Sequence, residues 1–166
     1  MYTTGRRWGQ QRRRPAIRKE TCYSRCMLEE RQVEEIVVGA IVDGCGRFLI
    51  QPRVGDIAMA GSWELPGGKI LPEEDHAAAL VREIAEETGL AVRVGDLAVA
   101  LCHAYPDRRV ALYAYVCEPV GDAKPPRWVR WTRPAEYREM PMPEANGPIL
   151  DALSALLTAD SSTSYK

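Results

Sequence analysis

The sequence of 166 residues predicts a single α+β domain in which helices pack on a mixed β-sheet. Strand-like apolar runs and amphipathic helical stripes both occur, and they do not alternate regularly as they do in parallel α/β folds. The length is ordinary for one domain and is sufficient to bury a core without disulfides. We expect the domain to span residues 33–158, because the apolar patterning begins and ends near these positions.

The charged residues are divided unevenly along the chain. The sequence has 22 Lys+Arg and 23 Asp+Glu, which gives a net charge of −1. Residues 1–19 hold seven basic residues and no acid, so the remainder carries −8. We expect residues 1–32 to be a disordered basic N-terminal extension and residues 159–166 a flexible tail. The extension is interpreted as solvated or as a translated leader; an organelle transit peptide and nonspecific contact with nucleic-acid phosphates are alternatives.

The first patterned segments indicate strands. Residues 36–42 form a continuous apolar run, which is typical of a strand buried on both faces. Turn-forming residues follow at 43–46, and residues 47–51 are predicted to be the strand that pairs with this run. A short strand at 63–65 is expected to end at the Pro-Gly-Gly sequence of residues 66–68.

The middle of the chain indicates a helix followed by a hairpin. Residues 75–88 carry an apolar stripe at helical spacing, and the helix dipole favours the acidic residues at its start. Gly89 is a natural C-terminal stop for this helix. Residues 98–105 and 110–117 are strand-like, and we predict that they form an antiparallel hairpin.

The last third of the chain is predicted to be mostly loop before a closing helix. Residues 119–148 hold seven of the 12 prolines, so we expect a loop around one strand at 128–131. An amphipathic helix is predicted for residues 148–157. No apolar run approaches the roughly 20 residues of a membrane span, and we expect no membrane partner.

The five cysteines are odd in number and most lie in hydrophobic surroundings, which favours buried free thiols in a reducing compartment over a disulfide framework. We therefore expect a cytoplasmic protein. Cys22 and Cys26 have the spacing of half a zinc site, but no second cysteine pair or nearby histidine completes it. A zinc site is accordingly disfavoured.

Three glutamates lie at helical spacing in the predicted helix 75–88. Glu83, Glu86 and Glu87 are placed at i, i+3 and i+4, so their carboxylates project from one face. Like charges at this spacing repel one another, and Arg82 can reach Glu86 and relieve only part of the repulsion. A bound Mg²⁺ or Mn²⁺ ion explains such a cluster, because hard cations take carboxylate oxygens and bridge to phosphates. An acidic surface stripe is the alternative.

A glycine-rich segment precedes this helix. Gly67 and Gly68 allow the backbone to approach a ligand closely, and the adjacent Lys69 can neutralise phosphate charge. By itself the segment is a common turn, and it does not match a Walker-type phosphate loop.

The glycine segment and the acidic helix together resemble the signature of the Nudix hydrolase family, G-x5-E-x7-R-E-U-x-E-E-x-G-U with U aliphatic. Its fixed positions are occupied by Gly68, Glu74, Arg82, Glu83, Glu86, Glu87 and Gly89. Ile84 and Leu90 occupy the aliphatic positions. The resemblance implies a Nudix-type mixed β-sheet sandwiched by helices. It also implies hydrolysis of a nucleoside diphosphate linked to another group, assisted by Mg²⁺ or Mn²⁺.

Within this family the chain is most similar to MutT-type 8-oxo-dGTP diphosphatases. Residues 63–69, 105–108 and 143–149 are similar to their W-E-F-P-G-G-K, F-P-D-R and P-P-A-N-E-P-V segments. This resemblance makes Asn146 the candidate that reads the base, since an amide offers a donor and an acceptor together. The alternative for Asn146 is an N-cap of the closing helix. Arg53 matches a nucleotide-contacting arginine, with a solvated loop arginine as the alternative.

The resemblance also implies catalytic roles. Glu83, Glu86 and Glu87 would hold the metal with the Gly67 carbonyl, and Glu83 would act as general base. Arg82 would orient the glutamates, and Lys69 would stabilise the leaving pyrophosphate. The two remaining motif residues, Gly68 and Glu74, would be structural, with Glu74 holding the loop against the helix. Arg108 matches a further substrate-binding position.

Two departures from the family pattern are visible. Leu71 and Glu73 stand where members often have an acidic residue and a glycine. The loop at 121–126 lacks the further metal-binding glutamate of some MutT-type enzymes, and Asp122 or water is the alternative ligand at this place. The number of bound metals is therefore left open.

We expect a Mg²⁺- or Mn²⁺-dependent enzyme that hydrolyses oxidised purine nucleoside triphosphates to the monophosphate and pyrophosphate. A broad CTP or pyrimidine triphosphate hydrolase is the second enzyme hypothesis, and a non-catalytic nucleotide-binding module is the alternative from another class. Dinucleotide or ADP-ribose hydrolysis is less favoured. We expect no specific nucleic-acid partner and either a monomer or a homodimer.

Overall fold

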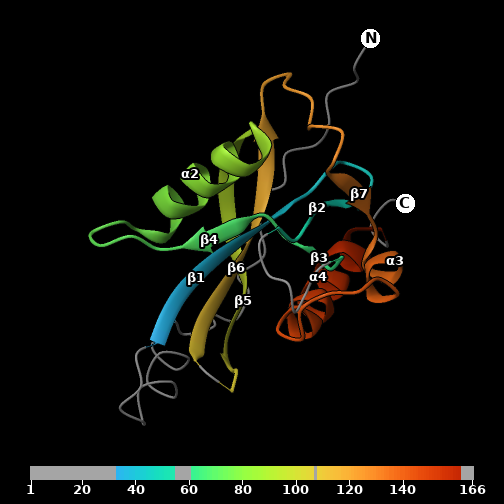
Figure 1. Cartoon of the computed structure of the whole chain (residues 1–166). Coiled ribbons are helices and arrows are strands. Elements are labelled where there is room, and N and C mark those ends of the chain that lie inside the picture. Colours follow the sequence, from blue (N-terminus) through green and yellow to red (C-terminus); the bar gives the residue numbers. More distant parts are fainter. Residues whose placement is uncertain (1–32, 55–60, 107, 162–166) are drawn as a thin grey trace.

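The computed structural model describes residues 33–54, 61–106 and 108–161, and Figure 1 shows how its elements are arranged. The strands are β1 (Val33–Ile41), β2 (Phe48–Pro52), β3 (Trp63–Glu64), β4 (Gly67–Lys69), β5 (Ala91–Ala104), β6 (Arg109–Val120) and β7 (Arg130–Thr132). The helices are α2 (His76–Thr88), α3 (Pro134–Arg138) and α4 (Asn146–Ser161). The predicted extension at 1–32, with Cys22 and Cys26, lies outside the described residues.

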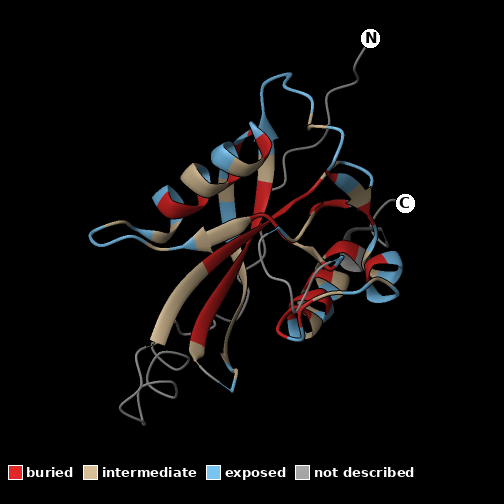
Figure 2. Ribbon diagram, viewed as in Figure 1, coloured by how far each residue is buried: buried red, intermediate tan, exposed pale blue. Residues whose placement is uncertain are grey.

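A four-stranded mixed sheet forms the centre of the molecule. Its strand order is β4-β1-β6-β5, with β1 and β6 parallel and both outer pairs antiparallel. Side chains of β1 alternate between two apolar clusters, so that Val37 and Ile41 face one side and Val38 and Ala40 the other. The prediction of a strand buried on both faces at 36–42 is confirmed, and Figure 2 shows the buried residues along it.

Helices cover both faces of this sheet (Figure 1). Helix α2 packs through Ala79, Leu80 and Ile84 on the cluster that contains Val37. Helices α3 and α4 lie on the opposite side, where Ile149 belongs to the second cluster. The predicted arrangement of a mixed sheet between helices is confirmed.

The pairing predicted for residues 47–51 is wrong. These residues form β2, but β2 lies in a second sheet between β3 and β7. A single isolated bridge between Val42 and Phe48 is the ladder contact recorded between the two segments. The reason is that β4 and β6 occupy both edges of β1, so β1 has no edge free for β2.

The hairpin predicted from residues 98–105 and 110–117 is confirmed as β5 and β6, and both strands are longer than expected. Strand β5 begins at Ala91, and its register with β6 shifts on either side of Leu97. Irregular pairing of this kind interrupts the period of two that identifies a strand in a sequence. The first half of β5 therefore escaped prediction.

The proline-rich stretch contains β7, as predicted, and also the short helix α3, which the sequence analysis missed. Pro134 opens this helix, a position where the missing N–H and fixed φ of proline are favourable. Helix α4 extends to Ser161, past its predicted end at residue 157. In the described part of the chain, no helix is long and apolar enough to cross a membrane.

Candidate active site

Strand β4 lies unusually close to its neighbours because two of its residues are glycines. Gly67 has a φ of 151°, and a Cβ atom built there would lie 2.1 Å from the carbonyl oxygen of Val37. A Cβ atom on Gly68 would lie 2.3 Å from Cδ of Glu83. Glycine at 68 therefore leaves the space in which the Glu83 carboxylate rests against the loop backbone.

Helix α2 presents the acidic residues to this strand. Asp75 caps its start by accepting a hydrogen bond from the amide of Ala78 at 2.7 Å, and Gly89 ends it in the left-handed conformation with a φ of 68°. Both boundaries agree with the sequence prediction. Glu83, Glu86 and Glu87 therefore all lie within the helix, and their spacing places them on the same face of it.

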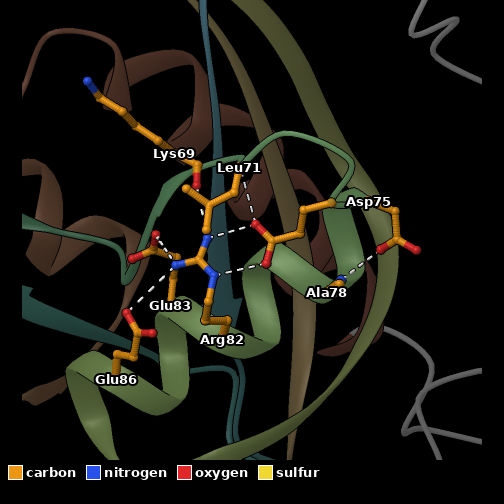
Figure 3. A network of polar contacts seen from close by, with 8 residues as sticks. Lys69, Leu71, Asp75, Ala78, Arg82, Glu83 and Glu86 are labelled. Carbon is orange, nitrogen blue, oxygen red and sulfur yellow. Dashed lines mark hydrogen bonds and ion pairs between the residues drawn. The ribbon is translucent and has the colours of Figure 1, made fainter.

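Each of the three glutamates has a defined partner, and Figure 3 shows those of Glu83 and Glu86. Glu83 accepts a hydrogen bond from Nη1 of Arg82 at 2.7 Å, and Glu86 lies 3.7 Å from the same nitrogen. Glu87 accepts from the backbone amide of Gly67 at 2.9 Å. Burial raises the pKa of the Glu87 carboxyl, and this amide hydrogen bond partly offsets the effect.

Arg82 connects the acidic helix to the loop between β4 and α2. Its Nε and Nη2 atoms donate to the two oxygens of Glu74 at 2.9 and 2.8 Å, and Nη2 also donates to the carbonyl of Lys69 at 3.1 Å. Glu74 in turn accepts from the amide of Leu71 at 3.1 Å. These hydrogen bonds lower the pKa of Glu74 and raise that of Arg82. The contacts agree with the expectation that Glu74 holds the loop against the helix.

The residue types of this acidic face fit a hard divalent cation, since all three side chains offer carboxylate oxygens. Among the described residues, however, no three histidine, cysteine or acidic side chains converge as a ready-made metal site. The contacts explain this: Arg82 holds Glu83 and Glu86, and the amide of Gly67 holds Glu87. Asp122 is exposed in the loop after β6.

A cleft of about 230 Å³ opens beside the glycine strand. It brings together all three residues predicted to bind substrate, Arg53, Arg108 and Asn146. Gly67, Gly68 and Lys69 line one end of it, and Leu65 and Tyr105 contribute apolar and aromatic surface. The cleft and the acidic helix therefore meet at the glycine strand.

Two acidic residues that the sequence analysis did not single out neutralise the cations of this cleft. Glu34, on β1, lies 2.6 Å from Nζ of Lys69 and 3.9 Å from Nε of Arg108. Glu64, on β3, forms an ion pair with Arg53. Lys69 accordingly points away from Glu83, as Figure 3 shows. No local sequence signal identifies these pairs, because each joins residues from separate segments of the chain.

Asn146 is the most deeply buried of the predicted substrate residues, with 6% of its surface exposed. It is the first residue of α4, and its Nδ2 donates to the hydroxyl of Tyr137 at 2.7 Å. Tyr137 donates in turn to the carbonyl oxygen of Trp63 at 2.6 Å. The amide is therefore held at the cleft wall by a residue that the sequence analysis missed.

The cysteines agree only in part with the expectation of buried thiols. Cys117 is a buried free thiol, and burial raises its pKa to about 12. Cys45, by contrast, is an exposed free thiol. Its position in the turn between β1 and β2 explains the exposure.

Comparison with known proteins identifies the same family that the signature residues of this site resemble. The chain matches the NUDIX domain family over residues 37–152. It is 34% identical over 126 residues to the CTP pyrophosphohydrolase of Escherichia coli K12, covering 74% of this chain and 93% of that protein. It is 31% identical over 128 residues to the 8-oxo-dGTP diphosphatase of the same strain, covering 74% and 97%.

Solved structures agree with this assignment. The solution structure of the E. coli ORF135 protein superposes with a TM-score of 0.65 at 29% identity, covering 78% of this chain and 94% of that one. The MutT NUDIX hydrolase from Burkholderia pseudomallei superposes with a TM-score of 0.64 at 25% identity, covering 73% and 98%. Since the family match spans most of the chain and the signature residues contact one another, the protein belongs to the Nudix hydrolases.

Proposed function

We propose that this Nudix hydrolase converts oxidised purine nucleoside triphosphates such as 8-oxo-dGTP to the monophosphate and pyrophosphate, and thereby cleans the nucleotide pool. The observation that carries the proposal is the cleft in which Asn146 lies with Arg53 and Arg108 beside the glycine strand. A buried amide suits the polar edge of a base, and the two arginines suit phosphate oxygens. The similarity to an 8-oxo-dGTP diphosphatase supports the same substrate class.

The reaction requires a cation for the acidic face, and Mg²⁺ or Mn²⁺ fits its all-oxygen ligands. Glu83, Glu86, Glu87 and the carbonyl of Gly67 would hold it. When bound, such an ion neutralises phosphate charge and makes a coordinated water more acidic. Arg82, which contacts Glu83 and Glu86 here, would orient these carboxylates.

The protein's own groups supply the proton transfer and the charge stabilisation. Water would attack the β-phosphorus and release the monophosphate from pyrophosphate, as the MutT-type resemblance implies. Glu83 would take the proton from this water, because its carboxylate lies against the glycine strand that lines the cleft. Lys69 would stabilise the leaving pyrophosphate. Since Lys69 now contacts Glu34, we expect the phosphates to replace Glu34 as its partner when substrate binds.

A broad CTP or pyrimidine triphosphate hydrolase is the second candidate. The similarity to the CTP pyrophosphohydrolase, at 34% identity, is somewhat stronger than that to the 8-oxo-dGTP diphosphatase of the same strain, at 31%. The acidic helix would perform the same chemistry on either substrate, so the difference lies in the cleft. A cytosine also offers a donor beside an acceptor, which the Asn146 amide can pair with.

Steady-state kinetics of pyrophosphate release with 8-oxo-dGTP, dGTP and CTP separates these candidates. We expect kcat/KM to be highest for 8-oxo-dGTP, activity to vanish with EDTA, and Glu83→Gln to lower kcat by about 10²–10⁴-fold with the fold intact. A preference for CTP would replace the first candidate by the second. An absence of turnover with Mg²⁺ and with Mn²⁺ would favour the non-catalytic binding module.

The remaining expectations belong to the same proposal. We propose a cytoplasmic enzyme, supported by the free thiols of Cys45 and Cys117. We propose that it acts on free nucleotides without a specific nucleic-acid partner, as a monomer or a homodimer. Light scattering coupled to size-exclusion chromatography distinguishes these two oligomeric states.

A further inference from the structure

The structure assigns to Tyr137 the role of a positioning residue that fixes which groups of the Asn146 amide are offered to the base. This inference rests on the proposed function, in which Asn146 recognises the base. Tyr137 belongs to α3 and is fully buried. It is not among the described residues that line the cleft, so it acts through Asn146 and not on the substrate directly.

The direction of the hydrogen bonds around Tyr137 follows from elementary chemistry. Its hydroxyl lies 2.6 Å from the carbonyl oxygen of Trp63 and 2.7 Å from Nδ2 of Asn146. The carbonyl oxygen has no proton, so the hydroxyl must give it its only proton. The hydroxyl oxygen can then only accept, and the amide group that faces it must be the NH₂.

The hydrogen bonds from Asn146 to Tyr137 and from Tyr137 to Trp63 form a relay. This relay decides between two orientations of the Asn146 amide that are otherwise nearly equivalent in shape. If the Asn146 amide were turned over, its oxygen would face the Tyr137 oxygen, and two buried acceptors would meet without a proton between them. Buried polar groups left unpaired are strongly unfavourable, because they have lost their hydrogen bonds to water and gained none in the protein. Because Asn146 is only 6% exposed, water has little access to compensate.

The consequence lies at the base. One N–H of Asn146 is committed to Tyr137, so the amide oxygen and the second N–H remain for a ligand in the cleft. Guanine presents two acceptors, N7 and O6, on the corresponding edge. Oxidation at C8 puts a proton on N7 and turns this edge into a donor beside an acceptor. The fixed amide is complementary to the oxidised edge and mismatched to the unoxidised one.

The surroundings keep Tyr137 in place for this role. Its ring packs edge-on against Phe48, with the ring centroids 5.7 Å apart. Burial raises the pKa of its hydroxyl, so the proton that Trp63 accepts is present throughout the working pH range. The relay therefore joins α3 and the start of α4 to β3, which is distant from both in the sequence.

The first test replaces the hydroxyl alone. We expect Tyr137→Phe to lower the ratio of kcat/KM for 8-oxo-dGTP to that for dGTP by about 10-fold, because the amide loses its fixed orientation. The loss should fall on 8-oxo-dGTP, with dGTP turnover little changed. In an Asn146→Ala background the same substitution should leave the ratio unchanged.

Tyr113→Phe is the matched control. Tyr113 is also a buried tyrosine, and its hydroxyl donates to Glu35 at 3.2 Å, but its ring belongs to the cluster beneath α2. This variant should lower stability without moving the ratio. A Tyr137→Phe protein that keeps the wild-type ratio within twofold, while Asn146→Ala changes it, overturns the relay and leaves the proposed function standing.

A second measurement needs no variant. NMR of the wild-type protein should show one Asn146 side-chain N–H that exchanges slowly with solvent, because it is buried against Tyr137. Rapid exchange of both protons overturns the relay even if Tyr137→Phe fails to fold. If the wild-type protein does not prefer 8-oxo-dGTP, the proposed function is overturned instead. The rate of Asn146 side-chain N–H exchange alone then tests the relay.

Discussion

Glu73 is one of the residues at which the chain departs from its family's pattern, and its backbone is strained. It has a φ of 66°, the one positive value recorded for a non-glycine residue in the described part of the chain. Family members often have glycine here, and glycine adopts this conformation without steric cost. A β-carbon in the left-handed region costs about 1–2 kcal/mol. The chain therefore carries a side chain at a backbone conformation that favours glycine.

Glu73→Gly should stabilise the protein by about 0.5–1 kcal/mol, because relief of the strain exceeds the added entropy of the unfolded chain. Thermal unfolding followed by circular dichroism measures this change. Glu139→Gly is the matched control, since Glu139 is exposed at the end of α3 with a φ of −86°. It should be neutral or destabilising, and equal stabilisation by both variants would show that strain is not the cause.

At the scale of elements, the contact of β4 with α2 depends on the missing side chain of Gly68. Gly68→Ala places a methyl group 2.3 Å from Cδ of Glu83, so the carboxylate must move. Displacement of a catalytic group by about 1 Å can cost 10²-fold in rate, and we expect a loss of kcat of about that size.

Gly44→Ala serves as the control for this prediction, because a Cβ atom there meets nothing within 4 Å. Far-ultraviolet circular dichroism and steady-state kinetics should show both variants folded and only Gly68→Ala impaired. Normal kcat in Gly68→Ala would mean that the position of Glu83 is not critical.

The hydrogen bonds between Arg82 and Glu74 form a clamp that holds the β4–α2 loop against the helix. This clamp makes the stability of the protein depend on pH. Arg82 holds the pKa of Glu74 below its ordinary 4.5. The folded protein therefore binds this proton less readily than the unfolded chain. The resulting stabilisation is present above the ordinary pKa and is lost as the pH falls through the lowered one.

Glu74→Gln should be less stable than the wild type at pH 7, and the difference should shrink as the pH falls below about 4.5. Melting temperatures between pH 7 and pH 3 measure this convergence. Glu139→Gln, at an exposed site, should follow the wild-type curve. A constant difference between Glu74→Gln and the wild type would argue against the clamp.

The elements that could be predicted are those defined by local patterns. Helix α2 was predicted with its C-terminal stop because Gly89 and the apolar stripe lie within one stretch of sequence, whereas the capping role of Asp75 comes from the structure. The pairing of β2 was mispredicted because it depends on which distant strands occupy the edges of β1. Tyr137 escaped notice for the same reason, since Trp63 and Asn146 reach it from other segments.

On the scale of the whole molecule, the acidic residues of the sequence are concentrated in the region proposed to carry the chemistry, and the basic excess lies outside it. Residues 73–87 hold six acids and one arginine, so much of the acidity of the domain lies on the face proposed to bind cations. The cleft and its cations are built from residues between Glu34 and Asn146. The proposed chemistry therefore does not require residues 1–32.

Deletion of residues 1–32 should leave kcat and KM for 8-oxo-dGTP within about twofold of the full chain. The reason is that we expect these residues to bind neither the substrate nor its transition state. Kinetics of both proteins at low and physiological salt measures this. A salt-dependent loss of activity in the shortened protein would instead indicate that the basic extension attracts the substrate electrostatically.

The central claim is that water attacks the β-phosphorus of 8-oxo-dGTP at the acidic face of α2. Hydrolysis of 8-oxo-dGTP with Mg²⁺ in ¹⁸O-labelled water, followed by mass spectrometry of the products, tests it most directly. The account predicts one ¹⁸O atom in pyrophosphate and none in the nucleoside monophosphate. Label in the monophosphate, or release of a single phosphate, would contradict it.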